Sequence, residues 1–264
     1  MSVSAPVLGP SLAHKPPPSR IHRATVGVVV LVFGALWLFE GHYLVTAWLP
    51  PLFDDLTPIN GVAAGAFMTL MLACSIAVFA RPRTTLGPFR LLVVGAALLA
   101  GLLPLAFLRS APLVTLGLSI GGYGLLAGMA LSHPGRDRLL PSFALNRPMI
   151  IAGLMFVIPF APIGIEMLVN QLTLDDEIAQ RWFYGGYSLY LSTIVAYALI
   201  AAVHRDTRIL FAAAASILAA ILGLVSIVYP GAIHSLGVLG GGLVLVWAVG
   251  FAALTWAVSR TPDS

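Results

Sequence analysis

Eight long apolar runs, separated by short polar segments, dominate the chain. They cover residues 24–47, 61–80, 88–108, 112–132, 148–168, 182–203, 208–230 and 236–258. A helix needs about 20 apolar residues to cross a hydrocarbon core about 30 Å thick. Backbone groups find no hydrogen-bond partners in lipid, so each run is predicted to be helical. The pattern therefore predicts an all-α integral membrane protein with eight transmembrane helices.

Composition excludes a water-soluble domain. Hydrophobic residues make up 59% of the chain and charged residues 9%, with a mean hydropathy of +0.97. A soluble domain carries roughly 25% charged residues, so this chain cannot cover a surface that faces water. The pI is about 9.6, but the basic residues lie between apolar runs. That placement is typical of membrane topology rather than of a nucleic-acid interface, and no nucleic-acid partner is expected.

The charges in the connections predict the orientation. With the N-terminus inside, 12 of the 14 Lys and Arg residues fall on the cytoplasmic side, and only Arg109 and Arg181 fall outside. Short loops rich in Lys and Arg stay in the cytoplasm. Residues 1–22, which are polar and proline-rich, are predicted to be a disordered cytoplasmic tail. The prediction is a multi-pass protein of the cell membrane with both termini cytoplasmic.

The two halves of the chain resemble each other. Residues 23–132 and 148–259 each contain four runs, and a predicted cytoplasmic loop, 133–147, joins them. Glu40 comes late in its run and is followed by "FDD" and "RPRTT". Glu166 comes late in its run and is followed by "LDD" and "HRDTR". Four-helix halves keep the same orientation, which predicts two parallel repeats. Chance similarity between helices rich in Ala, Leu and Gly is the alternative.

Glu40 and Glu166 are the main candidates for chemistry. Each lies about 25 Å along its helix from the cytoplasmic edge, at 1.5 Å per residue. Carboxylates within transmembrane segments are costly and usually face a bundle interior or a cavity. The two acids therefore predict an outward-facing pocket in which they form an acid/base pair. In the alternative interpretation, each is a carboxylate that extends toward the nearby interface.

Aromatic and polar side chains near the same predicted membrane face are expected to bind the substrate. They are Trp37, Tyr43, Tyr184, Tyr187, Arg109 and His234. Trp37 and Tyr43 lie three residues before and after Glu40, which places all three on one face of an α-helix. Aromatic residues also form interfacial belts, and we expect Trp182 to belong to one.

No metal or cofactor site is predicted. HxxxH and HExxH spacings are absent, and so are a mid-span histidine pair for haem, a phosphate-binding GxxxxGK[ST] loop and a mid-span lysine for retinal.

Two glycine-rich segments resemble parts of the rhomboid intramembrane proteases. "GLSIGGYGLLAG" at 117–128 is similar to their serine segment, and "HSLGVLGG" at 234–241 is similar to their histidine segment. The resemblance implies an intramembrane serine protease with a Ser119–His234 dyad. Ile120 departs from it, because the family has glycine directly after the serine. Close helix packing at glycines is the alternative interpretation.

Three classes of function fit these features. The first is a membrane enzyme that performs acid/base chemistry on a lipid or isoprenoid-like substrate. The second is a proton- or cation-coupled carrier, and the third is a non-catalytic subunit of a membrane complex. Polar residues lie at one end of the runs rather than at mid-membrane, where carriers bind substrate, which favours the enzyme. Membrane lipids and a small apolar substrate are the expected partners, and the sequence leaves a protein partner or homo-oligomer open.

Overall fold

The computed structural model describes residues 19–46, 58–82, 84–108, 112–135 and 143–260, and these ranges contain helices and no β-strand. The helices are α1 (Arg20–Leu36), the π-helix η2 (Trp37–Gly41), α2 (Tyr43–Thr46), α3 (Pro58–Ala80), α4 (Leu86–Leu102), the 3₁₀-helix η3 (Leu103–Phe107), α5 (Pro112–Ser132), α6 (Arg147–Thr173), α7 (Glu177–Gln180), α8 (Phe183–Val203), α9 (Arg208–Val228) and α10 (Gly237–Arg260). Eight helical segments in these ranges are long and apolar enough to span a membrane. The predicted multi-pass helical architecture is confirmed at this level.

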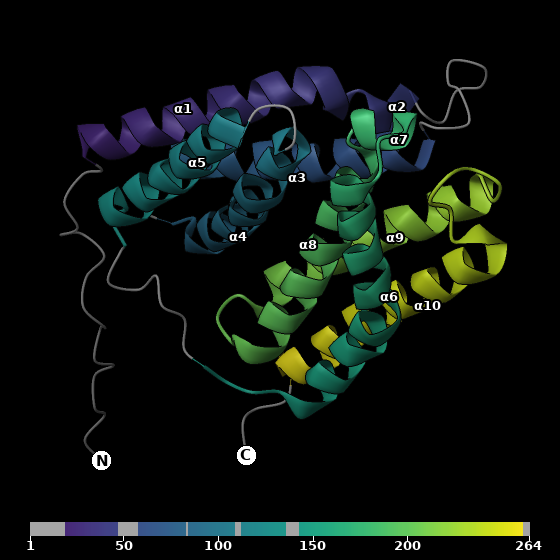
Figure 1. Ribbon diagram of the computed structural model, residues 1–264. Coiled ribbons are helices and arrows are strands. Elements are labelled where there is room, and N and C mark those ends of the chain that lie inside the picture. The colour runs from purple at the N-terminus through teal and green to yellow at the C-terminus, as the bar shows by residue number, and fades with distance from the viewer. Residues whose placement is uncertain (1–18, 47–57, 83, 109–111, 136–142, 261–264) are drawn as a thin grey trace, which may run out of the picture.

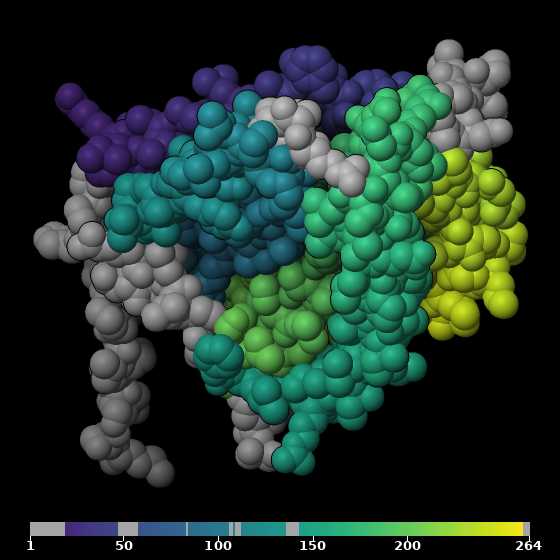
Figure 2. Space-filling model, in the orientation of Figure 1, coloured from purple at the N-terminus to yellow at the C-terminus, as the bar shows by residue number. Residues whose placement is uncertain are grey.

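The bundle has a central and a peripheral set of helices (Figure 1). Helices α3, α8 and α9 are mostly buried, and α4 packs against α3, α5 and α8. Helices α1 and α5 pack against each other at the periphery of the first half, as α6 and α10 do in the second half. In Figure 2, α6 lies at the surface in front of α8 and α9. The peripheral helices expose large apolar side chains, as helices that contact lipid do.

Small residues let the helices of the second half approach closely. Helices α9 and α10 meet at Gly223 and Gly241, where a Cβ added to either glycine would lie within 2.7 Å of the carbonyl oxygen of the other. Trp247 on α10 donates from Nε1 to the carbonyl oxygen of Ala152 on α6, at 2.7 Å. Close backbone contact and interhelical hydrogen bonds are the forces that hold helices together in lipid, where apolar burial contributes little.

The two halves meet where α3 and α4 of the first half pack against α8 and α9 of the second. Tyr197 on α8 is fully buried and donates from its hydroxyl to the carbonyl oxygen of Leu91 on α4, at 3.1 Å. One turn further along α4, a Cβ added to Gly95 would lie 2.6 Å from both the Tyr197 hydroxyl and the Met71 sulfur of α3. The halves therefore form one closely packed core.

The bundle has two ends, which we call the Glu40 end and the His133 end. The Glu40 end contains η2, α2, the start of α3, α7 and the connection between α9 and α10. The His133 end contains the start of α1, the end of α5 and the connection between α8 and α9. There Arg208 donates to the carbonyl oxygens of Ala201, at 3.3 Å, and Ala144, at 3.2 Å, which ties the segment before α6 to the end of α8.

Helix α6 extends to Thr173, five residues beyond its predicted end at 168. Near its end, the buried Gln171 donates from Nε2 to the carbonyl oxygen of Ala179, at 2.9 Å, and accepts from the backbone N–H of Gly185, at 3.0 Å. These bonds satisfy a polar side chain that the apolar pattern could not place. Glu166 therefore lies inside the helix and not near its end.

Candidate functional site

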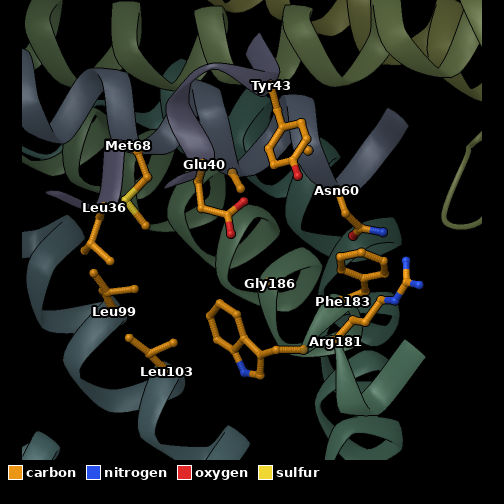
Figure 3. A pocket seen from close by; sticks show the side chains of 13 residues that line it. Leu36, Glu40, Tyr43, Asn60, Met68, Leu99, Leu103, Arg181, Phe183 and Gly186 are labelled. Atoms are coloured by element: carbon orange, nitrogen blue, oxygen red, sulfur yellow. The ribbon is translucent and has the colours of Figure 1, made fainter. Parts of the chain in front are cut away.

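A cavity of about 200 Å³ lies at the Glu40 end, between α1, η2, α2, α3, α4 and the start of α8. Its lining residues are Leu36, Glu40, Tyr43, Asn60, Gly61, Ala64, Met68, Leu99, Leu103, Arg181, Trp182, Phe183 and Gly186. Figure 3 shows the carboxylate of Glu40 pointing into the cavity. Apolar side chains lie on one side of this carboxylate, and polar and aromatic side chains lie on the other. The cavity is therefore amphipathic, with an acid at its centre.

The π-helix places Glu40 in the cavity. Residues Trp37–Gly41 form one wide turn within the first membrane-spanning segment. Such turns are rare in proteins, and those that occur are often found at functional sites. A regular α-helix would place Trp37 and Glu40 on one face, and the wide turn moves them apart. Trp37 instead donates from Nε1 to the hydroxyl of Thr69 on α3, at 3.0 Å, and lies outside the cavity lining.

Two glycines of α3 let the segment that carries Glu40 lie directly on that helix. A Cβ added to Gly61 would lie 3.1 Å from Cβ of Tyr43. A Cβ added to Gly65 would lie 2.7 Å from the backbone nitrogen of Leu44 and 3.1 Å from the carbonyl oxygen of Glu40. The spacing of four residues puts both glycines on the same face of α3. The depth of Glu40 in the bundle therefore depends on the absence of side chains at these positions.

Trp182 forms another wall of the cavity and has a left-handed backbone, with φ of 60°. Its indole ring packs against Gly185 one turn into α8. In the turn before it, Arg181 and Glu177 form an ion pair, and the backbone N–H of Trp182 donates to the carbonyl oxygen of Ala179 at 3.0 Å. A large residue with positive φ is strained, and such strain clusters at functional sites. Trp182, which was expected to belong to an interfacial belt, also lines the cavity.

His234 lies in a cluster beside the cavity and is the other described non-glycine residue with positive φ, 65°. Its Nδ1 is 3.2 Å from Oδ1 of Asn60, which also lines the cavity. Its ring stacks on Tyr187, with centroids 5.0 Å apart, and lies 5.3 Å from the ring of Tyr184. The Tyr184 hydroxyl donates to Asp176, at 3.1 Å.

Burial lowers the pKa of His234 to about 4, so its imidazole is neutral at neutral pH. With Oδ1 of Asn60 as the acceptor, Nδ1 carries the proton and Nε2 has a free lone pair. Nε2 is buried and has no hydrogen-bond partner among the described residues. The Tyr187 hydroxyl is also buried and has no hydrogen-bond partner among the described residues. Buried polar atoms of this kind are uncommon and are often found at functional sites.

The structure brings together five of the predicted site residues. Glu40 and Tyr43 line the cavity, and Tyr184, Tyr187 and His234 form the adjoining cluster. The hydropathy pattern placed this cluster near the same predicted membrane face as Glu40 but showed no contact that connects the two. Asn60 makes the connection, because it both lines the cavity and contacts His234.

Besides Trp37, three other predicted residues lie elsewhere or cannot be placed. Glu166 is exposed on α6 and does not line the cavity. It lies two residues, or about 200° around the helix, from Gly164, whose carbonyl oxygen accepts a bond from Ser188 of α8 at 2.8 Å. Arg109 lies outside the described residues. Ser119 lies on α5, which packs against α1 and α4, whereas His234 packs against α3 and α8, so these two are not brought together.

A histidine pair lies at the opposite end of the bundle. His22 and His133 are buried, and their rings meet edge to face at 5.2 Å. Nδ1 of His22 is 3.3 Å from the hydroxyl of Ser132, and Nδ1 of His133 accepts from the backbone N–H of Gly135 at 3.0 Å. Burial, with a smaller contribution from His22, lowers the pKa of His133 to about 4. The pair joins the start of α1 to the end of α5. Its two residues are far apart in the sequence, so no motif or spacing predicted this contact.

Comparison with known proteins identifies no relative of this chain. No family model, no curated protein and no solved structure matches it. A functional conclusion therefore depends on the residues of the site itself.

Proposed function

We propose that the protein is a membrane enzyme that acts on a lipid or isoprenoid-like substrate, with Glu40 as its acid/base group. The observation that carries this proposal is the carboxylate of Glu40, which points from a π-helical turn into a cavity of a membrane-spanning bundle. A carboxyl group can accept or donate a proton when a substrate atom lies within hydrogen-bond distance. Strain at Trp182 and His234 adds support, because both residues border this region.

The cavity walls suit the reacting end of an amphiphile. A volume of about 200 Å³ holds about seven groups of water size, at about 30 Å³ each. The rings of Tyr43, Trp182 and Phe183 line it. Aromatic faces stabilise positive charge, including charge that develops during a reaction of an isoprenoid. We propose that Asn60 binds the substrate and that His234 positions the Asn60 side chain.

The proposed enzyme uses Glu40 alone, because Glu166 is exposed on a different helix and does not line this cavity. We keep the proposal of two parallel four-helix repeats. Its support is that the first and fourth membrane-spanning helices of each half pack against each other at the periphery. We also keep the proposed position in the cell membrane with both termini cytoplasmic, which follows from the distribution of Lys and Arg. In that orientation the cavity lies toward the outer face.

Purified protein in liposomes of a total membrane lipid extract tests the class of function. We expect mass spectrometry to detect a lipid species that accumulates with time and is absent with heat-inactivated protein. A constant lipid composition, together with proton uptake reported by a dye trapped in the liposomes, would indicate a carrier and overturn the proposal.

A further inference from the structure

An apolar groove adjoins the Glu40 cavity. It has a volume of about 320 Å³ and lies between α1, α4 and α5. Leu36, Leu99 and Leu103 line both spaces. In Figure 3 these three leucines lie together on one side of Glu40, across the cavity from Asn60. The groove therefore lies next to the apolar side of the cavity.

Glycines on α5 form one wall of the groove. Gly117 and Gly121 line it, and a Cβ added to either one would meet no atom within 4 Å. The adjacent Gly122 packs on α4, where an added Cβ would lie 2.7 Å from Cβ of Ala100. Helix α5 thus contacts α4 at Gly122 and leaves open space at its neighbouring glycines.

We infer that this groove binds the hydrocarbon chain of a single-chain amphiphile whose uncharged, hydroxyl-bearing head lies beside Glu40. The inference rests on the proposed function and names the substrate class of the same site. Every residue that lines the groove is apolar or glycine, whereas the adjoining cavity supplies the hydrogen-bonding groups. The two spaces share three lining leucines, and the change in polarity from groove to cavity matches the change along an amphiphile.

The volume of the groove fits a single hydrocarbon chain. At about 30 Å³ for a group of water size, 320 Å³ accommodates about eleven such groups. This volume matches one hydrocarbon chain of about eleven carbons, and two chains of that length would need about twice the volume. The groove lies between helices that pack at the periphery of the bundle, so a longer chain extends from it into the bilayer.

The charges around the cavity favour an uncharged head group on the amphiphile. The Glu40 carboxylate points into the cavity, and the lining cation Arg181 forms an ion pair with Glu177. A phosphate placed there would lie beside a carboxylate, and like charges at short distance repel. A hydroxyl donates to the carboxylate and accepts from the side chains of Tyr43 or Asn60, so an alcohol fits both requirements.

Farnesol, a single-chain isoprenoid alcohol, is a suitable probe. Its binding to the purified full-length protein in detergent is measured by the change in tryptophan fluorescence, with stoichiometry from native mass spectrometry. Gly121→Leu places a side chain in the groove, and Gly124→Leu places the same side chain on α5 where an added Cβ meets nothing and the groove is not lined. We expect Gly121→Leu to weaken farnesol binding at least tenfold, and Gly124→Leu to bind like the parent with the same melting temperature.

Four results would overturn the inference. They are the absence of farnesol binding to the parent, equal binding by both leucine variants, tighter binding of a diacylglycerol, and tighter binding of farnesyl diphosphate. The proposed function fails separately. If farnesol binds and Gly121→Leu blocks it while no lipid is converted in liposomes, the groove is a binding site and the enzyme proposal is wrong.

Discussion

Replacing Gly65 by alanine tests whether the segment carrying Glu40 lies on α3 as described. The added methyl would be 2.7 Å from the backbone nitrogen of Leu44 and 3.1 Å from the carbonyl oxygen of Glu40. Ordinary contact begins at 3.4 Å, so the first distance must grow by 0.7 Å (3.4 minus 2.7). Both neighbours are backbone atoms, which cannot rotate away, and the two segments must separate. Overpacking of this kind lowers the free energy of unfolding by about 1–3 kcal/mol, and the higher helix propensity of alanine offsets up to about 1 kcal/mol of this loss.

We therefore expect Gly65→Ala to lower the free energy of unfolding by up to about 2 kcal/mol, and by about 1–3 kcal/mol relative to an alanine placed where it meets no atom. Titration with SDS in mixed micelles, followed by circular dichroism, measures this quantity. Gly124→Ala is the matched control, because it makes the same change on α5 where the added Cβ meets no atom within 4 Å. The control should be at least as stable as the parent. If the two variants are equally stable, α3 does not contact the Glu40 segment this closely, and the described position of Glu40 is wrong.

Three further predictions concern the rest of the bundle. The folded-state pKa of His133, about 4, lies below its ordinary value of 6.5, so the unfolded chain binds more protons between these values and stability falls as pH drops from 6.5 to 4. His133→Gln should make this fall shallower in unfolding titrations at several pH values. Tyr197→Phe removes an interhelical hydrogen bond and should cost about 0.6 kcal/mol in the same assay, and a cost of zero would contradict the contact. In a Cys74→Ala background, Thr173→Cys should react with an impermeant maleimide on intact cells and Thr84→Cys only after permeabilisation, and the reverse would overturn the proposed orientation.

The helices could be predicted from sequence because the bilayer fixes their length and forbids unpaired backbone groups. The end of α6 could not, because the helix continues through Gln171. The polar atoms of this side chain are satisfied by Ala179 and Gly185, which come later in the chain. Hydropathy measures only the local cost of a polar residue, and a tertiary hydrogen bond changes that cost.

The two intramembrane acids show what a helix pattern leaves undetermined. Glu40 and Glu166 carry the same sequence signal, yet one lines a cavity and the other is exposed. A helix that is apolar on all sides does not specify which face turns inward. The π-helical turn at Glu40 and the left-handed backbone at Trp182 were also not predicted. In both places a tryptophan ring packs on a glycine in the next turn, Trp37 on Gly41 and Trp182 on Gly185, and the hydropathy pattern carries no sign of such contacts.

The role of Glu40 as the acid/base group is tested most directly by lipid conversion in liposomes with Glu40→Gln and Glu166→Gln. The amide keeps the size of the side chain and cannot exchange the proton. Each variant must first show the parent's elution volume and melting temperature in detergent. We expect Glu40→Gln to be inactive and Glu166→Gln, whose side chain is exposed on α6, to keep the parent rate. If Glu40→Gln is active, or if Glu166→Gln is as inactive as Glu40→Gln, then Glu40 is not the acid/base group of the enzyme.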